Sequence, residues 1–284
     1  MEKKKNKIAL WIALGVLLVV LIVWIHWGNT ALELTTYTVR SSRLPGSFEG
    51  YRIAHVSDLH NTEMGEDNEN LLQLLRDTEP DIIAITGDLI DSRRTDMEIA
   101  LDFVREAGKI APCYYVAGNH ESRIEEYIDF KAALETAGVT VLEDARMELT
   151  LAGECITLIG VRDPSFQVEE KDEEAAYMDA VLSQLCENGD GYCILLSHRP
   201  ELFETYAAHD IDLILSGHAH GGQFRLPWLG GVLVPGQGFF PKYEEGLHTQ
   251  ANTNMVISRG IGNSVVPVRI NNRPEVILIE LRKQ

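Results

Sequence analysis

Five short apolar runs along the chain each end directly in a polar cluster. Uninterrupted apolar runs of this length are typical of strands that are buried on both faces. The runs cover residues 51–57, 81–86, 113–117, 192–197 and 211–216, and the clusters read DLH, GDLID, GNHE, SHRP and GHAHGG. Open α/β sheets bind ligands outside the carboxyl ends of their strands. We therefore expect one site that collects the side chains of Asp58, His60, Asp88, Asn119, His120, His198, His218 and His220.

Amphipathic segments between these runs predict an alternation of strands and helices. Helices are expected over residues 68–78, 96–107, 125–137 and 169–187, with a short helix after residue 200. Residues 139–162 predict two or three short strands, and the stretches NMVIS and PEVILIEL predict two more near the C-terminus. The alternation indicates an α/β fold. Periodicity alone allows a single sheet as well as two.

The N-terminal segment is continuously apolar. Residues 8–27 contain no Asp, Glu, Lys or Arg, and a helix of this length spans about 30 Å, the thickness of the bilayer hydrocarbon core. Trp11, Trp24 and Trp27 lie near its ends, where amphipathic rings favour the membrane interface. The run is longer than the roughly 7–15 apolar residues of a cleaved signal peptide, and no clear A-x-A site follows it. We predict an uncleaved signal-anchor that crosses the cell membrane once.

Lysines before this segment predict its orientation. Four of them lie within residues 1–7, so the positive-inside rule places the N-terminus in the cytoplasm and the body of the protein outside it. The expected organisation is a cytoplasmic N-terminus over residues 1–7, a transmembrane signal-anchor over 8–27, a linker and edge strand over 28–50, and one domain over 51–284.

Composition narrows the choice of partners. The formal net charge is −18, and proteins that bind nucleic-acid polymers need basic surface to neutralise phosphates. No nucleic-acid polymer is therefore expected as a partner, whereas divalent cations are compatible with so acidic a body. The four cysteines show no CxxC spacing. A disulfide between Cys186 and Cys193 and the oligomeric state stay open.

The polar clusters also form a recognisable series. They read D-x-H, G-D-x-x-D, G-N-H-E, a lone His198 and G-H-x-H, in that order between residues 58 and 220. This series resembles the calcineurin-like metallophosphoesterase family. The later stretches GGQFRLP, VPGQGFFPKY and SRGIGNS are similar to the membrane-associated bacterial branch of that family. The resemblance implies an α-β-β-α sandwich of two mixed sheets, here preceded by one transmembrane helix.

The resemblance also implies a centre with two divalent metal ions. The ligands of one ion would be Asp58, His60 and His220. The ligands of the other would be Asn119, His198 and His218, and Asp88 would bridge both ions. Carboxylate, imidazole and amide groups without a thiolate suit Mn, Fe or Zn. One carboxylate can span two ions that lie about 3.5–4 Å apart.

The same resemblance implies a reaction. A hydroxide held between the two ions would attack phosphorus in line with the leaving oxygen. His120 would stabilise or protonate that oxygen as a general acid, and Asp91 would orient and charge the His120 imidazole. Glu121 and His55 are expected to be hydrogen-bonded structural residues.

Three further residues are candidates for contact with substrate. Arg199 could reach a phosphate, with a surface salt bridge as the alternative. Trp228 and Phe239 lie in the Gly- and Pro-rich stretch 226–243. This stretch predicts either an apolar lip near the site, facing lipid or a greasy substrate, or a loop folded onto the second sheet.

The favoured function is a membrane-anchored phosphoesterase that cleaves phosphodiester or pyrophosphate bonds, with an envelope or lipid-linked phosphoester as substrate. A phosphomonoesterase or nucleotidase of the same fold is the alternative within the enzyme class. A non-catalytic, metal-stabilised interaction module is the alternative outside it.

Overall fold

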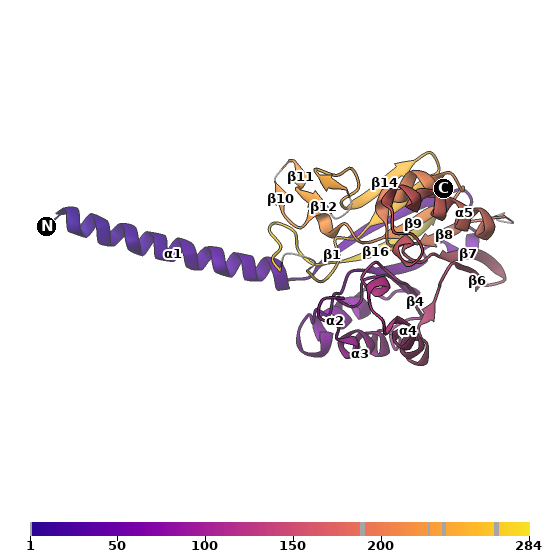
Figure 1. Cartoon of the computed structure of the whole chain (residues 1–284), viewed down its shortest axis with the longest axis horizontal. Helices are drawn as coiled ribbons and strands as arrows, with labels where there is room; N and C mark the ends of the chain where they lie inside the picture. The colour runs from indigo at the N-terminus through magenta and orange to yellow at the C-terminus, as the bar shows by residue number, and fades with distance from the viewer. Residues whose placement is uncertain (1, 188–190, 227, 235–236, 264–266) are drawn as a thin grey trace.

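Two mixed sheets packed face to face form the centre of the molecule, and helices cover their outer faces (Figure 1). The computed structural model describes residues 2–187, 191–226, 228–234, 237–263 and 267–284. Small parts of the stretches 226–243 and SRGIGNS, at residues 227, 235–236 and 264, lie outside the described residues. The two-sheet sandwich that the resemblance implies is confirmed, and the single-sheet alternative is wrong.

The first sheet has the strand order β1-β16-β2-β3-β4-β5. Strands β2 to β5 run parallel, β16 is antiparallel to β2, and β1 pairs parallel with β16 over its full length. Segment 28–50 therefore contributes a nine-residue edge strand to this sheet. The strands are β1 (Glu33–Ser41), β2 (Arg52–Val56), β3 (Ile82–Thr86), β4 (Cys113–Val116), β5 (Thr140–Val141) and β16 (Glu275–Lys283).

The second sheet has the order β14-β15-β9-β8-β7-β6. Its four inner strands are parallel and its two edge strands are antiparallel to their neighbours. The strands are β6 (Ala145–Leu151), β7 (Glu154–Gly160), β8 (Cys193–Leu196), β9 (Leu213–Ser216), β14 (Gly246–Gln250) and β15 (Thr253–Ile257). Two small hairpin-like pairs lie beyond β9, formed by β10 (Arg225–Leu226) with β11 (Gly230–Gly231) and β12 (Leu233–Val234) with β13 (Gly238–Phe239).

Helices occupy both outer faces. The first sheet is covered by α2 (Glu69–Thr78), α3 (Met97–Ala107) and α4 (Tyr127–Thr136), and the second by α5 (Glu174–Leu185) and α6 (Phe203–Ala207). Helix α5 is shorter than the predicted 169–187. Residues Lys171–Glu173 form a separate 3-10 turn instead, because this acidic stretch offers no apolar side chain to the sheet, whereas Met178 and Leu182 are buried.

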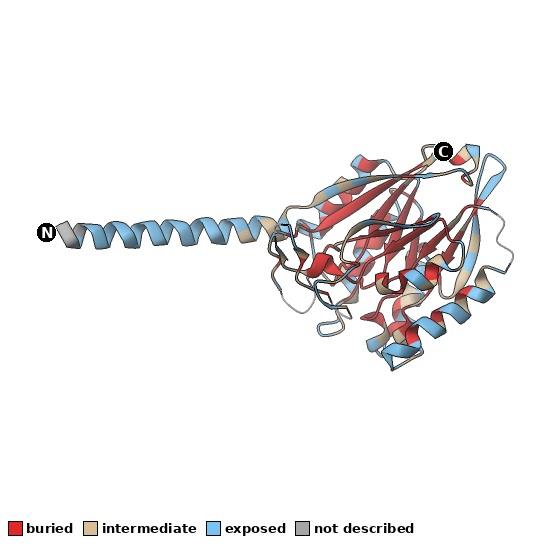
Figure 2. Cartoon of the chain, turned by 90° about the horizontal axis from the view of Figure 1, so that it is seen from above, coloured by how far each residue is buried: buried red, intermediate tan, exposed pale blue. Residues whose placement is uncertain are grey.

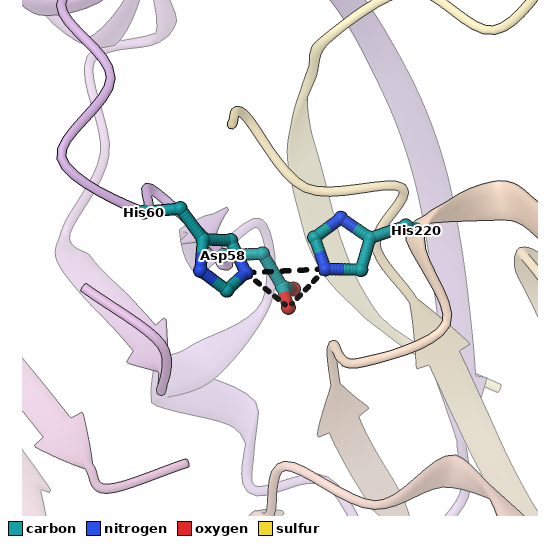
Figure 3. Close-up of side chains that lie close together, drawn as sticks. All are labelled: Asp58, His60 and His220. Atoms are coloured by element: carbon teal, nitrogen blue, oxygen red, sulfur yellow. Dashed lines mark hydrogen bonds and ion pairs between the residues drawn. The ribbon is translucent and has the colours of Figure 1, made fainter. Parts of the chain in front are cut away.

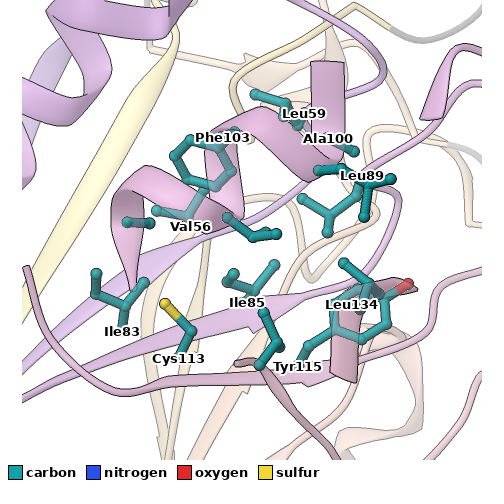
Figure 4. Packing of buried hydrophobic residues seen from close by; sticks show 14 of the residues in the cluster. Val56, Leu59, Ile83, Ile85, Leu89, Ala100, Phe103, Cys113, Tyr115 and Leu134 are labelled. Atoms are coloured by element: carbon teal, nitrogen blue, oxygen red, sulfur yellow. The ribbon is translucent and has the colours of Figure 1, made fainter. Parts of the chain in front are cut away.

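Alternating side chains on the inner strands explain the uninterrupted apolar runs. On β3, Ile82 and Ala84 face the second sheet, whereas Ile83 and Ile85 pack against the helices (Figure 4). Successive side chains of a strand point to opposite faces, and here both faces are buried. The four residues 82–85 are therefore all apolar, and polar side chains begin at Thr86, the last residue of the strand.

Helix α1 (Glu2–Thr30) extends away from this body (Figure 1). An 18-residue window within Asn6–Thr30 has a mean hydropathy of 3.1, and none of it is buried. Most of the helix is exposed, and only its C-terminal end is partly half-buried (Figure 2). An apolar helix with no protein partner needs another apolar environment, and its length matches a bilayer. This helix suggests membrane anchoring.

Candidate metal centre

All five polar clusters meet at the carboxyl ends of β2, β3, β4, β8 and β9. Three groups of potential ligands form there, each with ligand atoms within 4.8 Å of one another. The side chains are buried, and His198 Nδ1 lies 2.7 Å from the Thr86 carbonyl oxygen of the opposite sheet. The groups are Asp58–His60–His220, His60–Asp88–His120 and Asp88–His198–His218.

The first group surrounds a common point (Figure 3). His220 Nε2 lies 3.3 Å from Asp58 Oδ1, and His60 Nε2 lies 3.8 Å from the same oxygen. The two Nε2 atoms are 3.2 Å apart. One carboxylate and two imidazoles that converge in this way match the ligands of a divalent transition metal.

In the second group, potential ligand atoms of Asp88, Asn119, His198 and His218 face one another. His198 Nε2 lies 3.2 Å from Asp88 Oδ2 and 3.2 Å from His218 Nδ1. The Asn119 carboxamide oxygen faces His198 Nε2 at 3.2 Å and His218 Nδ1 at 2.8 Å. Hydrogen bonding alone would favour the reversed amide, which would donate to both imidazoles and accept from Arg123. The carboxamide oxygen, two imidazoles and one carboxylate converge here, and this donor set fits a metal ion.

Asp88 lies between the two groups. Its Oδ2 is 3.2 Å from His198 Nε2 and 3.6 Å from His60 Nε2, while Oδ1 accepts the His120 backbone N–H at 2.8 Å. One carboxylate thus faces a ligand from each group. This is the placement that a bridging ligand needs.

The backbone at these positions is itself unusual. Five of the candidate ligands have φ between 47° and 67°. Asp and His enter this left-handed region more readily than most side chains, and each such position costs roughly 1–3 kcal/mol. The chain accepts this cost where it turns the side chains toward one centre, at Asp58, His60, Asp88, His218 and His220.

Two glycines make the close approach of the strands possible. A Cβ at Gly217 would lie 1.9 Å from Ser57 Oγ and 2.4 Å from Asp58 Oδ2. A Cβ at Gly118 would lie 2.4 Å from Asp88 Oδ1. The glycines of the GHAH and GNHE clusters therefore allow the loops to pass directly beside the carboxylates.

Charge is divided among the ligands. Burial raises the pKa of Asp88, but His198 and His60 outweigh this effect and hold the pKa well below its usual range. Burial lowers the pKa of His198, but the nearby Asp88 carboxylate outweighs this effect and raises it to about 10. Burial lowers the pKa of His220 to about 3. The carboxylates are therefore anionic and His220 is neutral, whereas His198 would have to release its proton to bind a cation.

His120 lies at the side of this centre. Its ring is edge-on to His60, with centroids 4.5 Å apart. Its Nδ1 accepts the Ser92 backbone N–H at 3.1 Å and lies 3.4 Å from Asp91 Oδ1. Asp91 also makes two 3.0 Å bonds to the Arg93 guanidinium. The contact with Ser92 was missed by sequence reasoning, although Ser92 directly follows the GDLID cluster.

A cleft of about 400 Å³ opens beside His60 and Asp91. Its walls include Arg93 and Arg94, two cations that sequence reasoning also missed. They follow GDLID as SRR, and that spacing was the available signal.

Arg199 is buried, not at the surface. Its Nε and Nη2 donate to Asp163 at 2.5 and 2.9 Å, and Nη1 lies 3.4 Å from Glu201 and 3.6 Å from Glu174. The sequence allowed a salt bridge of Arg199 at the surface. The structure shows a buried salt bridge instead, because Arg199 is enclosed with Asp163, Glu174 and Glu201. Burial raises the pKa of Asp163, but Arg199 lowers it to about 2.

Trp228 and Phe239 do not fold onto the second sheet. Trp228 is fully exposed and Phe239 largely so. Three neighbouring apolar side chains are exposed as well, those of Leu226, Leu229 and Phe240.

Two residues near the centre hold backbone in place. Glu121 accepts the N–H groups of Asp88 and Gly118 at 2.9 and 2.8 Å. His55 Nε2 lies 2.8 Å from Thr86 Oγ1 in the core. Both are structural, as the sequence predicts.

A two-sheet sandwich with carboxylates and imidazoles at its strand ends defines a metal-dependent hydrolase. Residues 51–222 match the family described as calcineurin-like phosphoesterase. The chain belongs to this family and is a metal-dependent phosphoester hydrolase.

Similarity to individual proteins agrees. The chain is 30% identical over 260 residues to the uncharacterized metallophosphoesterase YkuE of Bacillus subtilis, covering 88% of this chain and 86% of the relative. It is 27% identical over 236 residues to the phosphodiesterase YaeI of Escherichia coli, covering 81% and 82%. The solved structure of TT1561 from Thermus thermophilus aligns with a TM-score of 0.52 at 18% identity, over 75% of this chain and 90% of that chain, a likeness of fold alone.

Proposed function

We propose that this chain is a membrane-anchored phosphodiesterase that holds two divalent metal ions, Mn, Fe or Zn, and cleaves phosphodiester or pyrophosphate bonds of an envelope or lipid-linked substrate. The observation that carries the proposal is the position of Asp88 between two ligand groups, with Oδ2 3.2 Å from His198 and 3.6 Å from His60. A shared carboxylate between two such groups supports two ions rather than one.

The ligands divide as the motifs imply. Asp58, His60 and His220 would hold one ion. Asn119, His198 and His218 would hold the other, with Asp88 between them. When bound, such ions supply a nucleophile from water at neutral pH and offset negative charge on the phosphoryl oxygens.

His120 is proposed as the general acid. The Ser92 N–H can only donate, so its bond to Nδ1 requires a lone pair there and leaves the proton of a neutral imidazole on Nε2. In the neutral ring that proton can hydrogen-bond a leaving oxygen; to transfer it, the ring must start as the imidazolium, with a second proton on Nδ1. Asp91, 3.4 Å from Nδ1, is placed to stabilise the ring when it is charged.

Substrate would enter through the cleft beside His60 and Asp91. Arg93 and Arg94 line it and can attract a phosphoryl group. Arg199 is also buried near the ligand groups, but its guanidinium is held by Asp163. The Arg93 guanidinium is likewise held by Asp91. Direct binding of phosphate is therefore proposed for Arg94, and positioning roles for Arg93 and Arg199.

The membrane side of the proposal rests on two apolar features. Helix α1 is an exposed apolar helix with the length of a membrane span. Figure 1 shows β10, β11 and β12 at the end of the domain from which α1 projects, and the exposed Trp228 and Phe239 belong to this region. Rings at that end would face the bilayer surface, outside the cytoplasm if the lysines set the orientation.

A substrate panel tests the proposal. The full chain in detergent would be assayed with Mn, Zn or Mg on a soluble diester, a monoester, a nucleotide diphosphate-sugar and a lipid pyrophosphate. We expect turnover of diester or pyrophosphate bonds and little monoester hydrolysis. Turnover of the monoester alone would overturn the diesterase assignment in favour of a phosphatase or nucleotidase, and no turnover with any metal would refute the enzyme.

A further inference from the structure

A cavity of about 290 Å³ lies where α1 joins the catalytic body. One wall is formed by the last turns of α1, with Trp24 and Trp27. The other is formed by the segment that precedes β16 and contributes Arg259, Arg269 and Arg273. Glu33 is the one carboxylate among the residues that line it. The cavity is separate from the cleft beside His60.

Arg269 is the unusual member of this cavity. It is 2% exposed and is the largest fully buried side chain in the described part of the molecule. Its Nη2 donates to the Gly262 carbonyl oxygen, but Nε and Nη1 have no hydrogen-bond partner among the described residues. Burial lowers the pKa of Arg269 to about 10, and the fields of Asp58 and Glu275 do not restore it. A buried cation with two unpaired donors is costly unless an anion completes it.

The other two arginines are placed differently. Arg259 is already paired with Glu275 at 2.8 Å and with Glu33 at 3.0 Å. Arg273 donates to the Ala31 and Leu32 carbonyl oxygens, and its Nη1 is as far as 4.0 Å from the Glu33 carboxylate. The charges of Arg269 and Arg273 are therefore the ones that remain available to a ligand.

The cavity is tied to the apolar helix. The Asn29 side chain accepts the Arg269 backbone N–H at 2.7 Å and donates to its carbonyl oxygen at 3.0 Å. The Arg273 guanidinium lies 4.8 Å from the centre of the Trp27 ring. Tryptophans at the end of a spanning helix lie at the level of the lipid headgroups. Arginines held beside them meet phosphates at that depth.

We propose that this cavity binds the phosphate of an anionic phospholipid headgroup, with Arg269 and Arg273 as its ligands and Trp27 beside the glycerol region. Arg269 would donate a charge-assisted hydrogen bond from Nη1 to a phosphate oxygen, and Nε, on another edge of the guanidinium, would donate separately to a second oxygen. The site goes beyond the proposed function, because it is a lipid site outside the metal centre. Of the proposed function, the lipid site requires only that α1 is inserted in a bilayer. Its occupancy would fix the angle between α1 and the catalytic body.

Thermal unfolding of the metal-loaded full chain in detergent micelles tests the site. The probes are short-chain phosphatidylglycerol, short-chain phosphatidylcholine and inorganic phosphate. We expect phosphatidylglycerol at about 100 times its Kd to raise Tm by roughly 5–10 °C, and phosphatidylcholine to raise it far less. Equal shifts with both lipids would overturn the proposal. An equal shift with inorganic phosphate alone would overturn the assignment to a lipid.

Variants locate the binding. Arg269→Gln should abolish the shift with phosphatidylglycerol. Because this residue is buried and the variant could fail to fold, Arg273→Gln, at a half-buried position, should reduce the shift at least threefold. Arg105→Gln, at an exposed position on α3, is the matched control and should keep it. A full shift in both cavity variants would refute the site.

Turnover of a soluble diester separates this outcome from that of the proposed function. Arg273→Gln should hydrolyse the diester at the wild-type rate while its lipid response falls. Loss of the lipid response with normal turnover supports the lipid site independently. A normal lipid response in a chain without turnover would refute the enzyme and leave the lipid site standing.

Discussion

The metal centre and the region around the base of α1 both contain buried charge, but they are built in opposite ways. At the centre, carboxylates and imidazoles lie within reach of one another, and Asp88 faces one histidine from each ligand group. At the base of α1, Arg269 is buried with two donors unpaired, and apolar rings such as Trp228 are exposed. The catalytic centre therefore offers anionic and imidazole ligands to the proposed cations, whereas the proposed lipid site offers unpaired guanidinium donors to an anion.

The largest expected effect comes from removing the shared carboxylate. Asp88→Ala should lose both metals and lower kcat on a soluble diester by several orders of magnitude, because each ligand group loses its common oxygen. Metal content by elemental analysis and turnover would be measured together. Asp102→Ala, at an exposed position on α3, is the control. Retention of two metals and normal turnover would break the contrast between the two regions.

Removal of the proposed general acid should affect chemistry without affecting metal. His120→Ala should lower kcat by about 10²–10⁴-fold with metal content near that of the wild type. A substrate with a good leaving group should lose less, because its oxygen needs less protonation. Wild-type rates on a poor leaving group would contradict the role.

Substitution within the buried Arg199–Asp163 pair should lower the stability of the fold, and the size of that loss should depend on pH. Asp163→Asn should destabilise the fold by up to about 3–5 kcal/mol at neutral pH, because the buried guanidinium then keeps only its longer contacts with Glu201 and Glu174. The pKa of Asp163 in the folded chain is about 2, below its ordinary 3.8. The contribution of the Asp163 carboxylate to folding stability is therefore complete above about pH 4 and is lost as the pH falls toward 2.

Denaturant unfolding across pH values would measure this contribution. The difference in stability between wild type and Asp163→Asn should shrink below pH 4. A constant difference down to pH 2 would show that the ion pair does not set it.

The smallest effect on chemistry, and the most selective, is expected at the membrane-side rings. The double variant Trp228→Ser and Phe239→Ser should leave turnover of a soluble diester unchanged and weaken turnover of a lipid-linked substrate. Both side chains are exposed, so the fold should tolerate the change. Equal loss on both substrates would show that the rings support structure rather than substrate.

The strand ends could be predicted because buried strands leave no ambiguity about where polarity begins. The run DIIAIT is apolar because both faces of β3 are covered, so Asp88 marks the first position free to reach a ligand. The same logic brought His198 and His218 to the common site, and the family resemblance paired them as ligands of one ion. Two packed sheets could not be derived from periodicity, since strands of either arrangement look alike. The family resemblance supplied that part.

The remaining contacts depend on distances in space that sequence spacing does not encode. Arg199 and Asp163 are far apart in the chain and meet only when two loops fold together. Ser92 reaches His120 through its backbone N–H, a group that every non-proline residue carries. No motif in the sequence includes Arg269, and only its burial distinguishes it.

Metal titration of the full chain tests the two-metal centre most directly. The metal-free chain would be titrated with Mn or Zn while turnover of a soluble diester and bound metal are followed. Turnover should rise until about two equivalents are bound per chain, and Asp88→Asn should never reach that point. Full turnover in the metal-free chain, or full turnover at one equivalent with no further binding, would contradict the account.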